Sequence, residues 1–468
     1  GHAYAWPRYD QVVVHDFIFG GMENVAATTL TDLVLTDDRA AIDWDSEDLI
    51  AHELAHQWFG DLVTCQDWSQ GWLNEGWATY SEVVWKTHDL GQDEADFHLF
   101  QDLTNYLSES GGRYQRAIVS YHFREPIDMF DRHLYEKGAL VNHTLRTILG
   151  ETAFWAGTKH YLNRHAHGTV HSRDLQRAME EVSGRNLDGF FQQFVESPGH
   201  PVLEVSSAWS KGQLKVTVTQ KQKGDGVPSA YRFPLTIKMV SEEGEEEITL
   251  QVQERSRAWA IPCTNEPIRV EVDAGFRILS DLRLKGPRPL LVASLHGDSC
   301  VVGRIRAARA LAKEGSPKAI SALVEALGKE TFWGARIKIA KLLATIGTTT
   351  ARQALLDHID DAHPKARRGI VDALGNLTPH PDVVDALTQI AQKGDPSLQV
   401  EAEAARSLGR LRAEGAVQLC AEVAKRESWG AMISARAIEG MSHTRDADAL
   451  PHLLEWTGGD RHERARAS

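Results

Sequence analysis

Apolar residues recur at helical spacing through the N-terminal part of the chain. Between about residues 30 and 200 they return every three or four positions, which is typical of helices with one buried face. The clearest stretches lie at 48–59, 74–86 and 140–149. Ser172-Arg173-Asp174 opens a further stretch, which Gly184 closes as a helix-ending glycine. We therefore predict a helical first domain over residues 1–200.

From about residue 201 to 285 the hydrophobic spacing changes from helical to alternating. Leu214, Val216 and Val218 alternate with polar residues, so that one face of an extended strand is apolar. The same alternation recurs at 248–252 and 268–272. This pattern predicts a small antiparallel β-sandwich over residues 201–285.

The rest of the chain repeats itself. Lys285-Gly286-Pro287-Arg288-Pro289 is a linker-like stretch, and short apolar segments follow it at regular intervals. Aligning Leu311, Leu343, Leu374, Leu408 and Ile438 gives spacings of 32, 31, 34 and 30 residues. A period of this length predicts an α-solenoid of paired helices that stack on their neighbours. We predict HEAT-like repeats over residues 286–468.

Arginines within these repeats leave two interpretations open. They occur at positions 304, 306, 309, 367 and 368. Such side chains usually face solvent, but on a concave solenoid surface they bind an acidic protein partner or a peptide C-terminus. A protein partner on the repeats therefore stays an open alternative.

Composition limits the classes of function. A chain of 468 residues is too long for one core, so about three domains are expected. The net charge of −14 argues against a nucleic-acid partner, and no apolar run approaches the length that spans a membrane. The four cysteines are widely separated and form no CxxC pair, which indicates free thiols rather than a disulfide framework. Free thiols fit a reducing compartment, so we expect a cytoplasmic protein.

The candidate chemistry lies at His52-Glu53-Leu54-Ala55-His56. On a helix, His52 and His56 are about 6 Å apart along the axis with both imidazoles on one face, which suits two ligands of one metal ion. Glu75 is the candidate third ligand, because catalytic zinc takes three protein ligands and keeps one position open. Glu53 is then placed to act as general base. The bare pattern also occurs by chance on soluble helices, and the apolar face of this segment and the second predicted helix favour the zinc site.

Four motifs occur in a fixed order. They read GGMEN at 20–24, HELAHQWFGDLVT at 52–64, WLNEGWATYSE at 72–82 and YEKGA at 135–139. In this order they resemble the aminopeptidase N family of zinc metallopeptidases, within the gluzincins. The resemblance implies a multidomain, mainly α protein with a thermolysin-like helical zinc catalytic domain. It extends less sharply to about residue 285, where the family also places a β-sandwich.

The first motif is implied to bind the substrate. Its residues are Gly20, Gly21, Met22, Glu23 and Asn24. Glycines let a backbone strand approach a substrate closely. Glu23 would pair with the free α-ammonium of a peptide, which directs cleavage to the first residue.

Tyr135 and Glu82 receive roles from the same resemblance. Tyr135 is implied to stabilise the oxygen that gains charge in the transition state. Glu82 lies two helical turns beyond Glu75, where the family carries an acidic residue. We expect its carboxylate to hydrogen-bond the ring nitrogen of a zinc-bound histidine that faces away from the metal.

The resemblance implies a zinc-dependent aminopeptidase with one zinc ion per chain, acting on peptides with a free N-terminus. One alternative is a catalytically impaired relative that serves as an interaction scaffold through its repeats. An endopeptidase of the thermolysin kind is disfavoured by the segment 20–24. The family normally carries an upstream β-rich domain; we expect it to be missing here, so that one wall of the cleft is supplied elsewhere.

Four histidines between residues 160 and 171 invite a second metal site. They are His160, His165, His167 and His171. His165 and His167 do not face the same way on a helix, and no cysteine or convergent carboxylate completes a ligand set. We predict structural or surface roles for all four.

Overall fold

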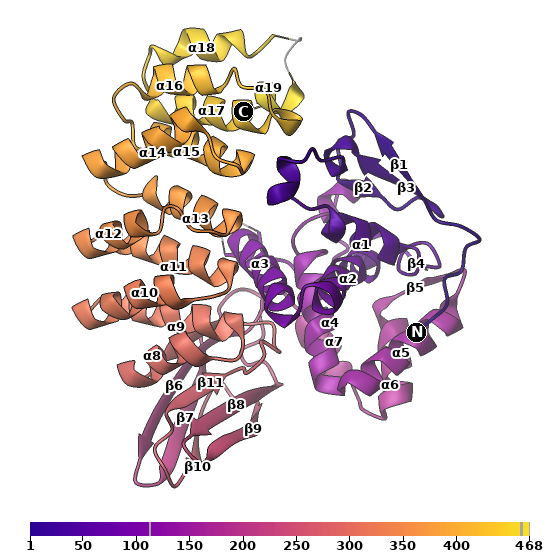
Figure 1. The fold of residues 1–468 in the computed structure, drawn as a ribbon. Helices are drawn as coiled ribbons and strands as arrows, with labels where there is room; N and C mark the ends of the chain where they lie inside the picture. The colour runs from indigo at the N-terminus through magenta and orange to yellow at the C-terminus, as the bar shows by residue number, and fades with distance from the viewer. Residues whose placement is uncertain (112–113, 459–461, 468) are drawn as a thin grey trace. The chain divides into compact units, whose positions relative to one another are not determined.

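The computed structural model describes residues 1–111, 114–458 and 462–467 (Figure 1). Its contacts separate two compact units. The first comprises Gly1–Asp32 and Ser46–Arg306, and the second comprises Leu33–Asp45 and Ala307–Ser468. The first unit contains both the helical and the β-rich regions. The three predicted domains are a finer division, and their boundaries stay a prediction.

A small sheet opens the first unit. It consists of β1 (Asp10–Val14), β3 (Ala27–Thr31) and β2 (Gly21–Met22), in that spatial order. β3 is parallel to β1 and antiparallel to β2. Leu30 in the central strand is buried, whereas the edge strand β2 leaves Met22 exposed.

Seven helices lie between this sheet and the β-rich region within the described residues. They are α1 (Glu47–His56), α2 (Trp72–Asp89), α3 (Gln92–Ser110), α4 (Glu136–Leu149), α5 (Glu151–His165), α6 (Ser172–Ser183) and α7 (Asp188–Phe194). Two short strands, β4 (Val63–Cys65) and β5 (Gly168–Val170), pair in parallel. Five 3₁₀ turns occur along the described chain: η1 (Asp32–Val34), η2 (Ala40–Ile42), η3 (Trp68–Gln70), η4 (Pro126–Met129) and η5 (Trp429–Ala431).

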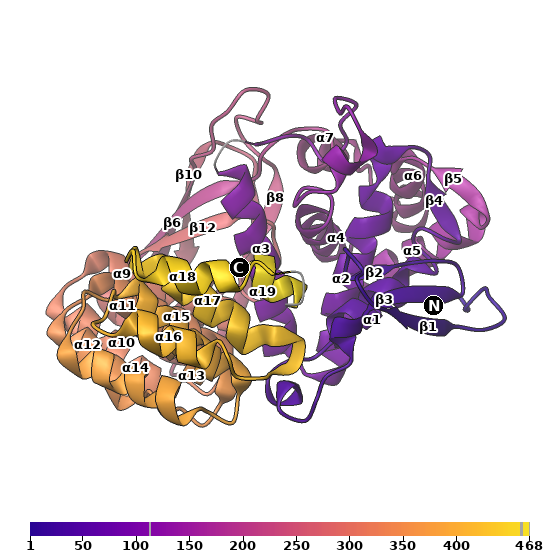
Figure 2. The same ribbon diagram turned by 90° about the horizontal axis from the view of Figure 1, so that it is seen from above.

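Helix α2 is the centre of this region and packs against α1, α3 and α4 (Figures 1 and 2). Its Trp72, Trp77 and Tyr80 are almost completely buried. The Trp77 ring stacks on Phe59, with ring centroids 4.5 Å apart. Aromatic burial of this size is a large hydrophobic contribution, so α2 is a rigid support for any group it carries.

Helices α2 and α4 cross at two glycines. A Cβ built on Gly76 would lie 2.9 Å from the Cα of Gly138, and one built on Gly138 would lie 2.8 Å from the Cα of Gly76. Neither position has room for a side chain. The close crossing matters because Gly76 directly follows Glu75 and Gly138 lies three residues after Tyr135.

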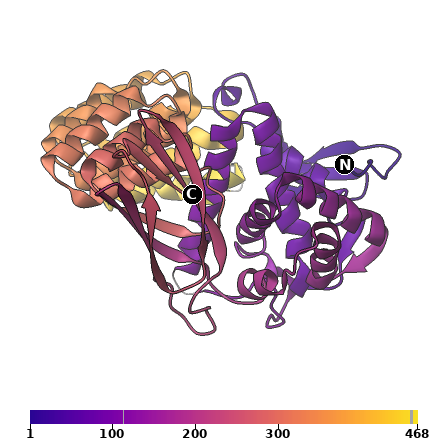
Figure 3. The ribbon, with the colours of Figure 1, turned by 90° about the horizontal axis from the view of Figure 1, so that it is seen from below.

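Two sheets make up the β-rich region (Figure 3). One contains β10 (Ser256–Pro262), β7 (Gln213–Gln220), β6 (Val202–Ser210) and β12 (Asp281–Lys285), and the other contains β11 (Arg269–Val272), β8 (Phe233–Ser241) and β9 (Gly244–Val252). Leu214, Val216 and Val218 are buried, as the alternation predicts. The pairs are antiparallel except β12 with β6, which is parallel. The chain reaches β12 from β11 in the other sheet. Because no hairpin joins β12 to β6, the two strands can pair in parallel.

The second unit is a stack of helices in chain order (Figure 1). The helices from residue 288 onward are α8 (Arg288–Gly297), α9 (Val301–Glu314), α10 (Pro317–Lys329), α11 (Trp333–Ile346), α12 (Thr349–Asp357), α13 (Pro364–Leu374), α14 (Pro381–Lys393), α15 (Leu398–Arg410), α16 (Ala416–Val423), α17 (Met432–Thr444), α18 (Ala449–Glu455) and α19 (Glu463–Ala467), of which α8 and the start of α9 belong to the first unit. The aligned repeat positions, from Leu311 to Ile438, are all buried. The prediction of a solenoid is confirmed.

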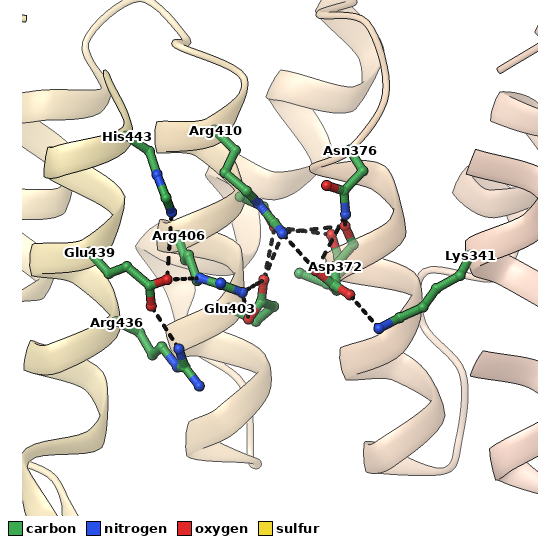
Figure 4. A network of polar contacts seen from close by, with 11 residues as sticks. Lys341, Asp372, Asn376, Glu403, Arg406, Arg410, Arg436, Glu439 and His443 are labelled. Atoms are coloured by element: carbon green, nitrogen blue, oxygen red, sulfur yellow. Dashed lines mark hydrogen bonds and ion pairs between the residues drawn. The ribbon is translucent and has the colours of Figure 1, made fainter. Parts of the chain in front are cut away.

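A polar network crosses the helices α11, α13, α15 and α17 (Figure 4). Asp372 accepts from Lys341 on one side, at 3.0 Å, and from Arg410 on the other, at 2.7 Å. The contacts continue through Glu403, Arg406, Glu439, Arg436 and His443. Each charged side chain of this network therefore has an opposite charge within the stack.

Several arginines for which solvent exposure or partner binding was predicted form ion pairs within the fold. Arg304 pairs with Asp93 at 2.8 Å, and Arg306 with the buried Asp273 at 3.0 Å. Arg367 binds both oxygens of Asp395, at 2.7 and 2.8 Å. These guanidinium groups hold segments together.

One segment from the N-terminal part of the sequence packs within the second unit. Arg39 donates to the backbone oxygen of Asp395 at 2.6 Å and also contacts Glu401. The indole of Trp44 lies against Trp429, with ring centroids 5.2 Å apart. Leu33–Asp45 is thus an integral part of the stack, although β3 and α1 of the first unit flank it in the sequence.

No helix among the described residues is long and apolar enough to cross a bilayer.

Candidate metal centre

Helices α1 and α2 bring three potential ligand atoms together. His52 Nε2 and His56 Nε2, four residues apart on α1, are separated by 3.1 Å. Glu75 Oε2, in the first turn of α2, lies 3.4 Å from the first of these nitrogens and 3.2 Å from the second. The three atoms form a nearly equilateral triangle.

Hydrogen bonds on the outer side of each ring decide the tautomer. His52 Nδ1 lies 2.7 Å from a carboxylate oxygen of Glu82, and His56 Nδ1 lies 2.9 Å from the backbone oxygen of Phe59. Both partners only accept, so each Nδ1 carries the proton. Each Nε2 therefore presents a lone pair to the other and to Glu75.

Three acceptors facing one another require a cation. Zinc binds imidazole nitrogen and carboxylate oxygen at about 2.0–2.2 Å, which places tetrahedral donors about 3.3 Å apart. The observed separations of 3.1–3.4 Å agree with this value. The residues fit a zinc ion with one open position.

Glu53 lies beside the three ligands and is buried. Burial raises its pKa to about 7; His52 and His56 oppose this, whereas Glu23 and Glu75 add to it. Among the described residues, its Oε2 has no hydrogen-bond partner. A carboxylate with such a pKa exchanges a proton readily near neutral pH.

Strand β2 runs directly against the Glu53 carboxylate. A Cβ built on Gly21 would lie 2.1 Å from Glu53 Oε1. The strand is held in place by Gln57, which accepts from the amide of Ala26 at 2.8 Å and donates to the backbone oxygen of Glu23 at 3.3 Å. Gln57 follows His56 on the chain, so the end of α1 fixes the predicted substrate segment.

The remaining residues of that segment take separate positions. Glu23 is half-buried, and its charge raises the pKa of Glu53. Asn24 is exposed and donates to the Thr29 hydroxyl at 3.0 Å. A Cβ built on Gly20 would meet Leu49 rather than a polar group. The structure thus brings Gly21 and Glu23 to the metal centre, while Asn24 bonds back to β3.

Tyr135 lies at the N-terminus of α4, beyond the crossing with α2. Its ring lies 6.0 Å from the His52 ring and 6.4 Å from that of Phe130. Burial, with the negative charges of Glu75 and Glu23, holds its pKa well above the ordinary value. The phenol therefore keeps its proton and remains a hydrogen-bond donor.

A second group of metal-compatible side chains lies elsewhere in the first unit. It consists of Glu109, Asp131 and His133. Arg116 already binds both oxygens of Asp131, at 2.7 and 2.8 Å. His133 Nε2 accepts from the amide of Arg116 at 3.4 Å. Asp131 is therefore already paired with a guanidinium, and His133 Nδ1 lies 3.2 Å from Glu109 and 3.4 Å from Asp131, which makes this group an internal polar cluster.

The histidines at 160–171 belong to neither group. His160 pairs with Glu181 at 2.8 Å, and the His167 ring lies 5.8 Å from that of Trp6. Among the described residues, these histidines form no group that could hold a metal. Their structural or surface role stays the prediction.

Two residues of the site were missed by sequence reasoning. Gln57 was overlooked because a glutamine after the last ligand has no recognisable spacing. His98, whose Nε2 lies 2.8 Å from Glu82 Oε2, comes from α3. Only the packing of α3 on α2 brings it near, and no sequence signal could have found it.

Comparison with known proteins agrees with this geometry. Residues 1–194 match the peptidase family M1 domain, and overlapping segments between residues 288 and 468 match HEAT repeats. Residues 1–194 thus resemble a family M1 peptidase domain and the later residues resemble HEAT repeats, so the resemblance to the aminopeptidase N family is confirmed.

Individual relatives point the same way. The chain is 31% identical over 264 residues to the Tricorn protease-interacting factor F2 of Thermoplasma acidophilum, covering 54% of this chain and 32% of that protein. It is 32% identical over 248 residues to aminopeptidase N of Streptomyces lividans, covering 51% of this chain and 28% of the relative. The chain therefore spans about a third of the length of the curated relatives it matches.

A solved structure shares the fold. The crystal structure of Legionella pneumophila aminopeptidase A in complex with aspartic acid superposes with a TM-score of 0.74 at 15% sequence identity. The match covers 96% of this chain and 59% of that one. At this identity the likeness shows the multidomain, mainly helical fold, as predicted.

Proposed function

We propose that the chain is a zinc-dependent aminopeptidase that hydrolyses the first residue from peptides with a free N-terminus. The observation that carries the proposal is the triangle of acceptors on His52, His56 and Glu75, with separations of 3.1–3.4 Å. The family M1 match and the relatives named as aminopeptidases support the reaction class.

Glu53 would move the proton in this reaction. When bound, zinc would polarise the scissile carbonyl and acidify the attacking water. Glu53 accepts a proton from that water and later donates it to the leaving amine. Its burial raises its pKa, which makes the carboxylate a better proton acceptor than an exposed glutamate.

Tyr135 would stabilise the developing oxyanion. A donor contributes most when it is already aimed at the oxygen before charge develops. The phenol is held by α4 next to the His52 ring, at 6.0 Å between ring centroids, and remains protonated because its pKa is raised. Its role is therefore to donate a hydrogen bond to the carbonyl oxygen.

Glu23 and strand β2 would set the exopeptidase specificity. Glu23 is half-buried beside Glu53 and offers a carboxylate to a substrate ammonium. Such a charge-assisted bond is strong and directional. The segment Gly20–Asn24 would align the first peptide bond with the metal centre.

A protein-interaction scaffold is the second candidate. HEAT repeats and the name of the Thermoplasma relative, an interacting factor of another protease, favour a protein partner on the repeats. The complete set of ligands, base and donor favours the enzyme. A cytoplasmic location stays a prediction.

Metal analysis and hydrolysis of aminoacyl fluorogenic substrates test the proposal together. We expect one zinc per chain, and activity that a chelator abolishes and zinc restores. Glu53→Gln should keep its zinc while losing activity by about 10²–10⁴-fold. A peptide with an acetylated amine should not be cleaved; cleavage equal to that of the free peptide would remove Glu23 from its role. Zinc without turnover would favour the scaffold.

A further inference from the structure

Behind the metal-binding face, three neighbouring helices each contribute two polar side chains four residues apart. The pairs are Asp48 and His52 on α1, Glu82 and Lys86 on α2, and His98 and Asp102 on α3. Residues four apart lie on the same helix face. The three pairs therefore meet where the helices pack.

Glu82 is the centre of this arrangement, because each of its oxygens has a different histidine. Oε1 lies 2.7 Å from His52 Nδ1, and Oε2 lies 2.8 Å from His98 Nε2. A carboxylate only accepts, so both nitrogens carry protons. Glu82 is thus fixed at both ends of its carboxylate.

His98 is itself held from its other side. Its Nδ1 lies 3.8 Å from Asp48 Oδ2, and the second oxygen of Asp48 lies 2.6 Å from Lys86 Nζ. The side chains of Glu82 and His98 are only 14% and 15% exposed. Water therefore has little access to replace either hydrogen bond, and losing one leaves a partly buried oxygen unsatisfied.

We propose that His98 is a positioning residue for the metal centre, acting on His52 through Glu82. This inference rests on the zinc site of the proposed function. The orientation of a metal-bound imidazole depends on the acceptor at its far nitrogen. With its second oxygen anchored by His98, Glu82 cannot rotate away from His52 Nδ1. Helix α3, which contributes no metal ligand, thereby contributes to the affinity of the site.

Two polar substitutions of His98 distinguish a role in positioning Glu82 from a role in packing alone. In His98→Gln the amide nitrogen replaces Nε2 and can still donate to Glu82. In His98→Asn the shorter side chain cannot reach that oxygen. Zinc affinity of the metal-free protein is measured by competition with a chromophoric chelator. We expect His98→Asn to weaken zinc binding by about 10-fold, the lower end for groups that orient ligands, and His98→Gln to stay close to wild type.

His143 provides a matched control on α4. It is a part-buried histidine with two hydrogen bonds, to the Tyr80 hydroxyl at 3.2 Å and to the backbone oxygen of Phe276 at 2.8 Å. His143→Asn should lower the melting temperature while leaving zinc affinity unchanged. Equal zinc affinities of His98→Asn and wild type would overturn the inference.

A double-mutant cycle tests whether His98 acts through Glu82. If it does, His98→Asn has no further effect on zinc affinity in a Glu82→Ala background, since interacting residues are not additive. Additive losses would refute the route through Glu82. Failure of the wild-type protein to bind zinc would instead refute the proposed function, so the two failures are distinguishable.

Discussion

Gly21 lies so close to the Glu53 carboxylate that replacing it with alanine should reduce activity while leaving stability nearly unchanged. In Gly21→Ala the new methyl group would lie 2.1 Å from Glu53 Oε1 and 2.3 Å from its Cδ. Contacts of a Cβ below 3.0 Å essentially never occur. Since Gly21 does not have a positive φ, alanine fits the backbone, and the carboxylate must move by about 1 Å.

This displacement sets the expected magnitude. A misplacement of about 1 Å costs on the order of 10²-fold in rate, which equals about 2.7 kcal/mol of transition-state stabilisation. Stability should change little, because the atom displaced is the end of a flexible side chain. We therefore expect kcat/KM on an aminoacyl fluorogenic substrate to fall about 100-fold, while the melting temperature and zinc content stay near wild type.

Gly20→Ala is the matched control. Its Cβ would meet only the methyl groups of Leu49, at 3.1 and 3.7 Å, so it perturbs the same segment without displacing Glu53, and kcat should fall far less than in Gly21→Ala. If Gly21→Ala has wild-type activity, Glu53 is not the base or its position is not critical, and the reasoning fails. A large loss of melting temperature in Gly21→Ala would show that the strand, rather than the carboxylate, had moved.

Further predictions concern packing, the phenol and acid stability. Gly138→Ala places a Cβ 2.8 Å from the Cα of Gly76. Overpacking of this kind should lower the free energy of unfolding by about 1–3 kcal/mol, which denaturant unfolding measures. An unchanged unfolding midpoint would contradict the close crossing of the two helices. Tyr135→Phe should lower kcat by about 10²–10³-fold, as for other oxyanion donors, with KM and zinc content nearly unchanged; an equal rise in KM would indicate a binding role. Burial alone would raise the pKa of Asp131, but the hydrogen bonds and charges of His133 and Arg116 hold it at about 2. The ionised carboxylate therefore stabilises the folded protein above about pH 4, and this contribution is lost as the pH falls toward 2. Asp131→Asn should therefore be less stable than wild type at pH 6, with the difference shrinking below pH 4; a constant difference would rule out the ion pair as its cause.

The spacing along single helices could be predicted from the sequence. His52 and His56 face the same way because they are four residues apart, and Glu75 follows at the start of the next predicted helix. The repeat positions from Leu311 to Ile438 were equally accessible, since burial recurs with a fixed period. Patterns within one element are encoded locally.

Relations between elements could not be predicted in the same way. His98 reaches Glu82 only because α3 packs on α2, and β12 lies parallel to β6 because the chain returns from the other sheet. The approach of Gly21 to Glu53 likewise depends on how β2 lies against α1. Such contacts join residues whose sequence separation carries no period.

The segment Leu33–Asp45 determines how this protein can be dissected. It packs with the helical repeats through Arg39 and Trp44, yet helix α1, with His52 and His56, begins two residues after it. A chain shortened to end near residue 306 would lose the partners of this segment and expose Trp44 just before the metal-binding helix. The repeats therefore cannot be removed by a single truncation: the chain passes between the two units three times, after residues 32, 45 and 306. Domain swaps with relatives must exchange 33–45 together with the repeats.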